Sequence, residues 1–155
     1  MNNSIVVAGC ENGKLAIWDL NTNSLNHMDI SNVRVSSLFA VEGMVITGDA
    51  QGNLKVVNGA GAVVLQSPQI QQGHRQPAEI LTINIIPGPK PIVMAGDTAG
   101  QMHFLTEEDS GQTLMCSQGG HNDKTEAVLK VITCPIENQN APVTIDQSGN
   151  FRLWM

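Results

Sequence analysis

Short apolar runs alternate with polar turns along this chain, and no stretch keeps a helical period. The pattern is clearest at four places, where a run rich in Val, Ile or Met leads through a turn ending in Gly. A second run follows each turn, with large apolar residues at every other position. Each segment therefore predicts two β-strands joined by a tight turn. The four segments read IVVAGCENGKLAIWDL from Ile5, MVITGDAQGNLKVVNG from Met44, IVMAGDTAGQMHFLTE from Ile92 and APVTIDQSGNFRLWM from Ala141.

The four segments form a repeat. Their turn glycines are spaced 39, 48 and 49 residues apart, which is too long for repeats of helical hairpins. Further apolar runs lie before the later copies, at 33–41, 80–86 and 127–134, and after the first three, at 24–29, 62–66 and 112–117. This gives about four strands per unit and an all-β chain without helices. The turn glycines are Gly13, Gly52, Gly100 and Gly149.

Alternation within the strand that follows each Gly predicts one buried and one polar face. The apolar face holds pairs such as Leu15 with Ile17, and the other face is small or polar. We expect the opposite face to carry Ala16, Lys55, His103 and Arg152.

These units resemble the WD-repeat β-propeller family over nearly the whole chain. The closest copy is NGKLAIWDL, with Trp18-Asp19 in the position that names the family, and SGNFRLWM keeps Trp154. The pairs Gly73-His74 and Gly120-His121 stand where the family places its Gly-His signature. The resemblance implies blades of antiparallel four-stranded sheet and large rings, such as Trp18 and Trp154, that pack between blades.

One departure concerns the residue before each turn Gly, where the family often has an Asp that is hydrogen-bonded to the His. The His-to-Asp network of the family is therefore not expected in any blade. The four positions hold Asn12, Gln51, Ala99 and Ser148.

The family register implies a partial β-propeller of about four WD-like blades, two complete and two incomplete. Strands run b-c-d, then a-b-c-d twice, then a-b-c, which makes 14 strands in one domain with units of about 1–30, 31–66, 67–117 and 118–155. This order is that of a C-terminal half. Open edges favour completion by a different segment, then a truncated gene product, then a strand-exchanged dimer. In a dimer, a unit lacking strand d would meet one lacking strand a.

Composition narrows the class of protein. The chain has 155 residues, 41% of them hydrophobic, with 8 Lys and Arg against 14 Asp and Glu and a net charge of -6. Nucleic-acid binding draws on clustered cations, so nucleic acid is not an expected partner. No apolar run approaches the ~20 residues that span a bilayer, so no membrane is expected either. Cys10, Cys116 and Cys134 lack CxxC spacing and predict reduced thiols in the cytoplasm or nucleus.

Acidic residues recur in the four Gly turns and would line one rim of the propeller. Asp suits tight turns because it bonds its own backbone, or the acids form a collar for a basic peptide or protein. The loop 67–78 opens on the same rim, whereas His27 and His103 read as lone histidines. The candidate partner-binding residues are Glu11, Asp49, His74, Arg75, Asp97, His121 and Asp146.

The motifs GxSxG, HExxH, GxGxxG and the P-loop are missing from the sequence, so no enzyme activity, cofactor or metal is expected. We predict a non-catalytic protein-protein interaction scaffold with protein or peptide partners, completed by another propeller segment or by self-association. One alternative is a propeller that binds a small molecule or metal through His74, His121 and Asp97, with or without catalysis. Another is a truncated fragment of a larger WD-repeat protein that has no function of its own.

Overall fold

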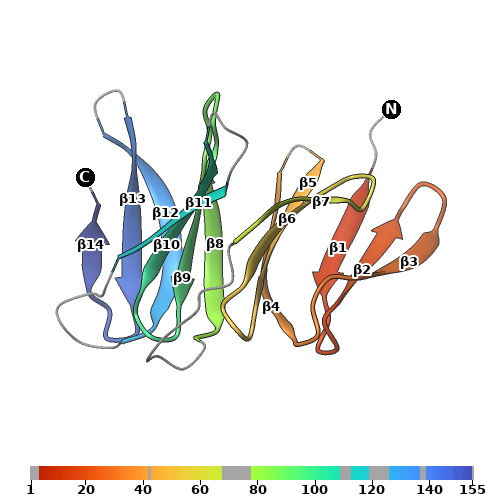
Figure 1. Cartoon of the computed structure of the whole chain (residues 1–155), viewed down its shortest axis with the longest axis horizontal. Coiled ribbons are helices and arrows are strands. Elements are labelled where there is room, and N and C mark those ends of the chain that lie inside the picture. The colour runs from red at the N-terminus through yellow and green to blue at the C-terminus, as the bar shows by residue number, and fades with distance from the viewer. Residues whose placement is uncertain are drawn as a thin grey trace.

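The structure, a computed structural model, describes residues 4–41, 43–67, 78–108, 113–118, 126–136 and 139–154. These residues form four antiparallel sheets, A to D, that stand in a row in chain order (Figure 1). Sheet A holds β1 (Ile5–Gly9), β2 (Lys14–Asp19) and β3 (Ser24–Asp29). Sheet B holds β4 (Val35–Val41), β5 (Met44–Asp49), β6 (Leu54–Asn58) and β7 (Val63–Gln66). Sheet C holds β8 (Ile80–Ile86), β9 (Ile92–Asp97), β10 (Met102–Glu107) and β11 (Thr113–Gln118). Sheet D holds β12 (Val128–Ile136), β13 (Gln139–Asp146) and β14 (Phe151–Leu153).

Within each sheet, consecutive strands are neighbours, so the chain runs as one hairpin after another. The predicted all-β class, the order of three, four, four and three strands, and the runs chosen as strands are confirmed over the described residues. The ends of the strands differ by one or two residues; β12, for example, continues to Ile136, because Pro135 still pairs with Asn140. No helix with the length and hydropathy of a membrane span occurs in the described part of the chain.

The turn before the third strand of sheet B shows why Gly is needed there. Gly52 has φ of +83°, a conformation that costs other residues free energy, and its N–H donates to Asp49 O at 3.1 Å. Asp49 N–H closes the hairpin on Asn53 O at 3.1 Å. The predicted Gly turns are thus confirmed, and positive φ recurs at Gly13, Gly100 and Gly149.

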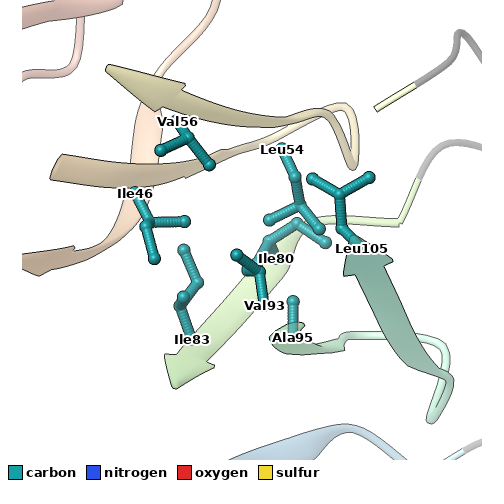
Figure 2. Packing of buried hydrophobic residues seen from close by; sticks show 8 residues of the cluster. All are labelled: Ile46, Leu54, Val56, Ile80, Ile83, Val93, Ala95 and Leu105. Atoms are coloured by element: carbon teal, nitrogen blue, oxygen red, sulfur yellow. The ribbon is translucent and has the colours of Figure 1, made fainter. Parts of the chain in front are cut away.

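Hydrophobic cores lie between neighbouring sheets. We call the face of a sheet that points to the next sheet in chain order its forward face, and the other its back face. At the B/C junction, the forward face of sheet B meets the back face of sheet C (Figure 2). Burial of these side chains supplies most of the stabilisation that holds the sheets together. This core comprises Ile46, Leu54, Val56, Ile80, Ile83, Val93, Ala95 and Leu105.

The expectation of one polar face per sheet is wrong for sheets B and C. In β6, Leu54 is buried in the B/C junction while Val57 is buried in the A/B junction. In β10, His103 is buried as well, although it lies on the face predicted to be polar. A sheet between two others is covered on both faces, and this arrangement does not show in its own alternation.

Candidate interaction surfaces

Asp49 lies in the Gly turn of sheet B, at the end of the sheets that we call the Gly-turn rim. Its carboxylate is buried and accepts hydrogen bonds from the backbone N–H of Gln51 at 2.9 Å and of Asn53 at 3.0 Å. The Asn53 amide donates to Oδ2 at 2.9 Å and the Ser31 hydroxyl donates to the same oxygen at 2.8 Å. Both oxygens of Asp49 are therefore engaged in holding the turn.

Asp97 and Asp146 repeat this arrangement in sheets C and D. Asp97 Oδ1 accepts the N–H of Ala99 at 2.9 Å and of Gln101 at 2.8 Å, and Asp146 Oδ1 accepts that of Asn150 at 2.8 Å. The interpretation that these Asp residues bond their own turns is confirmed. Their predicted role in partner binding is not tested by these bonds and stays a prediction. Both residues are buried, so little of either carboxylate lies at the surface.

Glu11 differs from the other acids of the set. Sheet A has Cys10 in place of the turn Asp, and Glu11 is exposed, with Oε2 3.9 Å from Nε of Arg34. The Arg34 guanidinium also pairs with Glu79 at 2.5 Å, so it links the connections that enter sheets B and C. The Gly-turn rim thus carries an exposed ion-pair network in addition to its buried turns.

For His103, the prediction of a lone histidine is wrong. His103 is buried, and its Nε2 lies 2.9 Å from Asp97 Oδ2. The sequence contained a usable signal, namely an Asp six residues upstream across a tight hairpin. His27 is exposed, as a surface residue of β3.

Three of the predicted site residues, His74, Arg75 and His121, lie outside the described residues. Among the residues that are described, no group of three or more His, Cys, Asp or Glu side chains is arranged to hold a metal ion. A site that combines Asp97 with either histidine therefore stays a prediction.

The two tryptophans, predicted to pack between blades, have different environments. Trp154 is buried in the C/D junction, as predicted, where its ring meets Phe104 edge-on at a centroid distance of 6.1 Å. Trp18 is exposed on the back face of sheet A, and its Nε1–H donates to Asn23 Oδ1 at 3.2 Å. For Trp18 the predicted packing between sheets is wrong, because no described sheet lies against that face.

An apolar hollow opens at the B/C junction on the rim opposite to the Gly turns. Its volume is about 380 Å³, within the usual range of ligand sites, and its floor is the B/C core. Three charged residues stand among its lining. We call it the B/C groove; it is lined by Met44, Ile46, Val56, Val64, Leu65, Ile85, Pro89, Lys90, Pro91, Val93, Glu107 and Glu108.

A smaller, polar hollow of about 280 Å³ lies at the A/B junction on the Gly-turn rim. Its lining includes the engaged carboxylate of Asp49, and Lys55, whose ammonium donates to the Ile30 carbonyl of the neighbouring connection. Asp49 and Lys55 thus bond to the connection between the two sheets, and the polar lining contrasts with the apolar lining of the B/C groove.

Comparisons with known proteins support the fold. No known family model matches the chain, and no curated protein does either. Among solved structures, the computationally designed Ika4 protein is similar with a TM-score of 0.72 and 22% identity, over 99% of this chain and 86% of that one. A chain of a mitotic checkpoint complex is similar with a TM-score of 0.73 and 19% identity, over 97% of this chain. The chain folds as a partial β-propeller.

This partial propeller spans 44% of the mitotic checkpoint chain. It also spans 43% of the designed Ika8 protein, with a TM-score of 0.70 and 24% identity over 99% of this chain. At these identities the likeness shows the fold alone. The sheets of the partial propeller therefore correspond to blades, and the Gly-turn rim and its opposite rim to the two ends of the propeller.

Proposed function

We propose that this partial propeller is a non-catalytic protein-interaction module of WD-repeat type whose B/C groove binds an extended peptide segment of a partner protein. The groove carries the proposal, because it combines an apolar floor with charged residues at its edge. Burial of an aliphatic side chain in such a hollow supplies affinity, and the charges fix the orientation of the peptide. The partner chemistry is a short aliphatic side chain flanked by charged residues.

The test is selection of random displayed peptides on the purified chain, followed by measurement of their affinity in solution. Val64→Glu places a charge in the groove and should weaken binding at least about tenfold, which equals about 1.4 kcal/mol. Val63→Glu is a matched control: Val63 is 47% exposed and Val64 51%, but Val64 lines the groove. Peptides that bind both variants equally, or no selected peptide at all, would contradict the proposal.

The Gly-turn rim is the second surface on which a partner could bind. The exposed carboxylate of Glu11 and the net charge of -6 favour a basic partner there, together with the residues predicted from the sequence. Peptide binding that is lost in Glu11→Ala and kept in Val64→Glu would overturn the groove proposal and place the site on this rim. We also propose a location in the cytoplasm or nucleus, which the free thiols of Cys10 and Cys134 support.

A further inference from the structure

The two end sheets each expose one apolar face. In sheet D, Trp154 points into the C/D core, so Phe151 and Leu153, at alternate positions of the same segment, lie on the forward face. In sheet A, Leu15 packs on sheet B, so Trp18 lies on the back face, with Leu25 paired opposite it. Among the described residues, no sheet covers either face.

The forward face of sheet D is one more copy of a surface that is buried elsewhere in the chain. The residue two positions after the turn Gly is fully buried in sheets A, B and C, but its counterpart in sheet D, Phe151, is 73% exposed. The four equivalent residues are Leu15, Leu54, Met102 and Phe151.

The back face of sheet A is likewise one more copy of a buried surface. Trp18 is 42% exposed, whereas its counterparts are 9% exposed or less, and Trp154 is one of them. The exposed faces of sheets D and A are therefore the two halves of a fourth junction of the kind that the chain already contains three times. The four equivalent residues are Trp18, Val57, Leu105 and Trp154.

A second observation shows which kind of sheet the forward face of sheet D can receive. In sheets A, B and C the strand partner of the residue two positions after the turn Gly is itself a glycine, namely Gly9, Gly48 and Gly96. The missing side chain lets the first strand of the next sheet approach closely. A Cβ at Gly48 would lie 2.5 Å from Cγ2 of Ile80, and one at Gly96 would lie 2.4 Å from Cγ1 of Val128. Sheet D has Ile145 at this position, paired with Phe151 as Gly48 is paired with Leu54. A next sheet with a first strand in that place would therefore overlap the Ile145 side chain.

Sheet A lacks this first strand among its described residues. Its described strands are β1, β2 and β3, of which β1 is equivalent to β5, so the described residues contain no counterpart of β4 in this sheet. On the back face of sheet A, none of the described strands takes the place that Val35, Ile80 and Val128 have at the three internal junctions. Ile145 has the size to fill it.

We propose that copies of this chain associate head to tail, with the forward face of sheet D in one copy packed on the back face of sheet A in the next. Ile145 takes the place of the missing first strand, and Phe151 and Leu153 face the Trp18 side of the second copy. Because one face lies on each end sheet, two copies satisfy both faces in a closed dimer with two equal junctions.

The first experiment measures the absolute mass of the purified chain by light scattering after size exclusion. We expect twice the 16.5 kDa of one chain. Phe151→Asp and Trp18→Asp should each give a monomer with unchanged circular dichroism, because both residues are exposed within one copy. Val63→Asp, at an apolar residue with similar exposure on the outer strand of sheet B, is the matched control and should stay dimeric.

Mixing the two monomeric variants distinguishes a head-to-tail junction from a symmetric one. Each variant keeps the face that the other has lost, so an equimolar mixture should regain one junction and form dimers. A monomeric wild-type chain would overturn the proposal. So would a dimer that survives either single substitution, or a mixture that stays monomeric. Peptide binding in the B/C groove does not depend on these residues, so this proposal and the proposed function can fail separately.

Discussion

Trp18 and Trp154 occupy the same position in the first and last sheets, yet their surroundings differ. The Trp154 indole N–H donates to Thr144 Oγ1 at 3.0 Å, the ring meets Phe104, and the Arg152 guanidinium carbon lies 4.2 Å from its centroid. The Trp18 indole N–H donates a hydrogen bond to Asn23 of its own sheet, and the ring is exposed. In a row of repeats, the environment of a residue is therefore set by the neighbouring sheet as much as by its own.

The same comparison holds for the other face of the sheets. Met102 of sheet C and Phe151 of sheet D are equivalent, but only Met102 has a sheet in front of it. Burial, and with it hydrophobic stabilisation, is concentrated in the middle of the row. Folding of one copy should therefore depend mainly on sheets B and C and on the faces of sheets A and D that contact them.

The largest expected effect comes from truncating the two tryptophans. Trp154→Ala should lower the free energy of unfolding by about 3–5 kcal/mol, because it leaves a cavity in the C/D core. Trp18→Ala should change it by less than about 0.5 kcal/mol, as exposed positions do. Urea titrations at low protein concentration, where association contributes least, measure both values. Equal losses in the two variants would show that sheet A is covered on its back face within one copy.

A smaller effect is expected from single substitutions at two equivalent positions, Gly96 of sheet C and Ile145 of sheet D. Gly96→Ile should cost about 1–3 kcal/mol, because its Cβ meets Val128 across the C/D junction. Within one copy, measured at low protein concentration where association contributes least, Ile145→Gly should cost no more than about 1 kcal/mol, which is the usual penalty for Gly in a strand. Thermal unfolding of the two single variants makes the comparison. Gly149→Ala is the control for backbone strain without a clash between sheets, because φ is positive there and nothing lies within 4 Å of a Cβ. If sheet C tolerates Ile as well as sheet D does, the close approach of neighbouring sheets is not what selects Gly.

The strand layout could be predicted from the sequence because it depends on local signals. Alternation and the Gly turns place the strands to within two residues, and the hydrogen bonds of Asp49 are made within its own turn. The bonding of Asp49 to its own turn could thus be anticipated, as one of two interpretations of the acids in the Gly turns. The choice between them needed the burial of the carboxylate, which depends on how the connection at Ser31 closes over it.

Contacts between sheets could not be predicted in the same way. His103 and Trp18 were both misassigned, since alternation within a strand shows that two faces differ but not whether a second sheet covers them. The change from Gly48 to Ile145 was visible in the aligned repeats. Its meaning depends on the 2.5 Å that would separate a Cβ at Gly48 from Ile80, and this distance is set by the packing of two sheets.

The smallest expected effect concerns Asp19 of sheet A, whose counterpart in sheet B is Asn58. Asp19 Oδ1 accepts the N–H of Asn21 at 2.8 Å and of Thr22 at 3.3 Å, and Asn58 Oδ1 accepts the N–H of Ala62 at 2.9 Å. The hydrogen bond from Asn21 is the main cause that holds the pKa of Asp19 below its ordinary value of 3.8. A carbonyl oxygen on Asn58 caps its turn without any charge.

Asp19 should therefore make the stability of the chain slightly sensitive to acid. Because its pKa is lower in the folded chain, its contribution is present above the unfolded pKa and is lost as the pH falls below about 4 through the folded pKa. Asp19→Asn, which copies sheet B, should keep the turn and remove this part of the pH dependence. Urea midpoints of both proteins at pH 6 and pH 3 measure the difference, and an NMR titration follows the Asp19 carboxyl directly. A carboxyl that titrates at or above the ordinary Asp value would show that the N–H groups of Asn21 and Thr22 do not stabilise its charge.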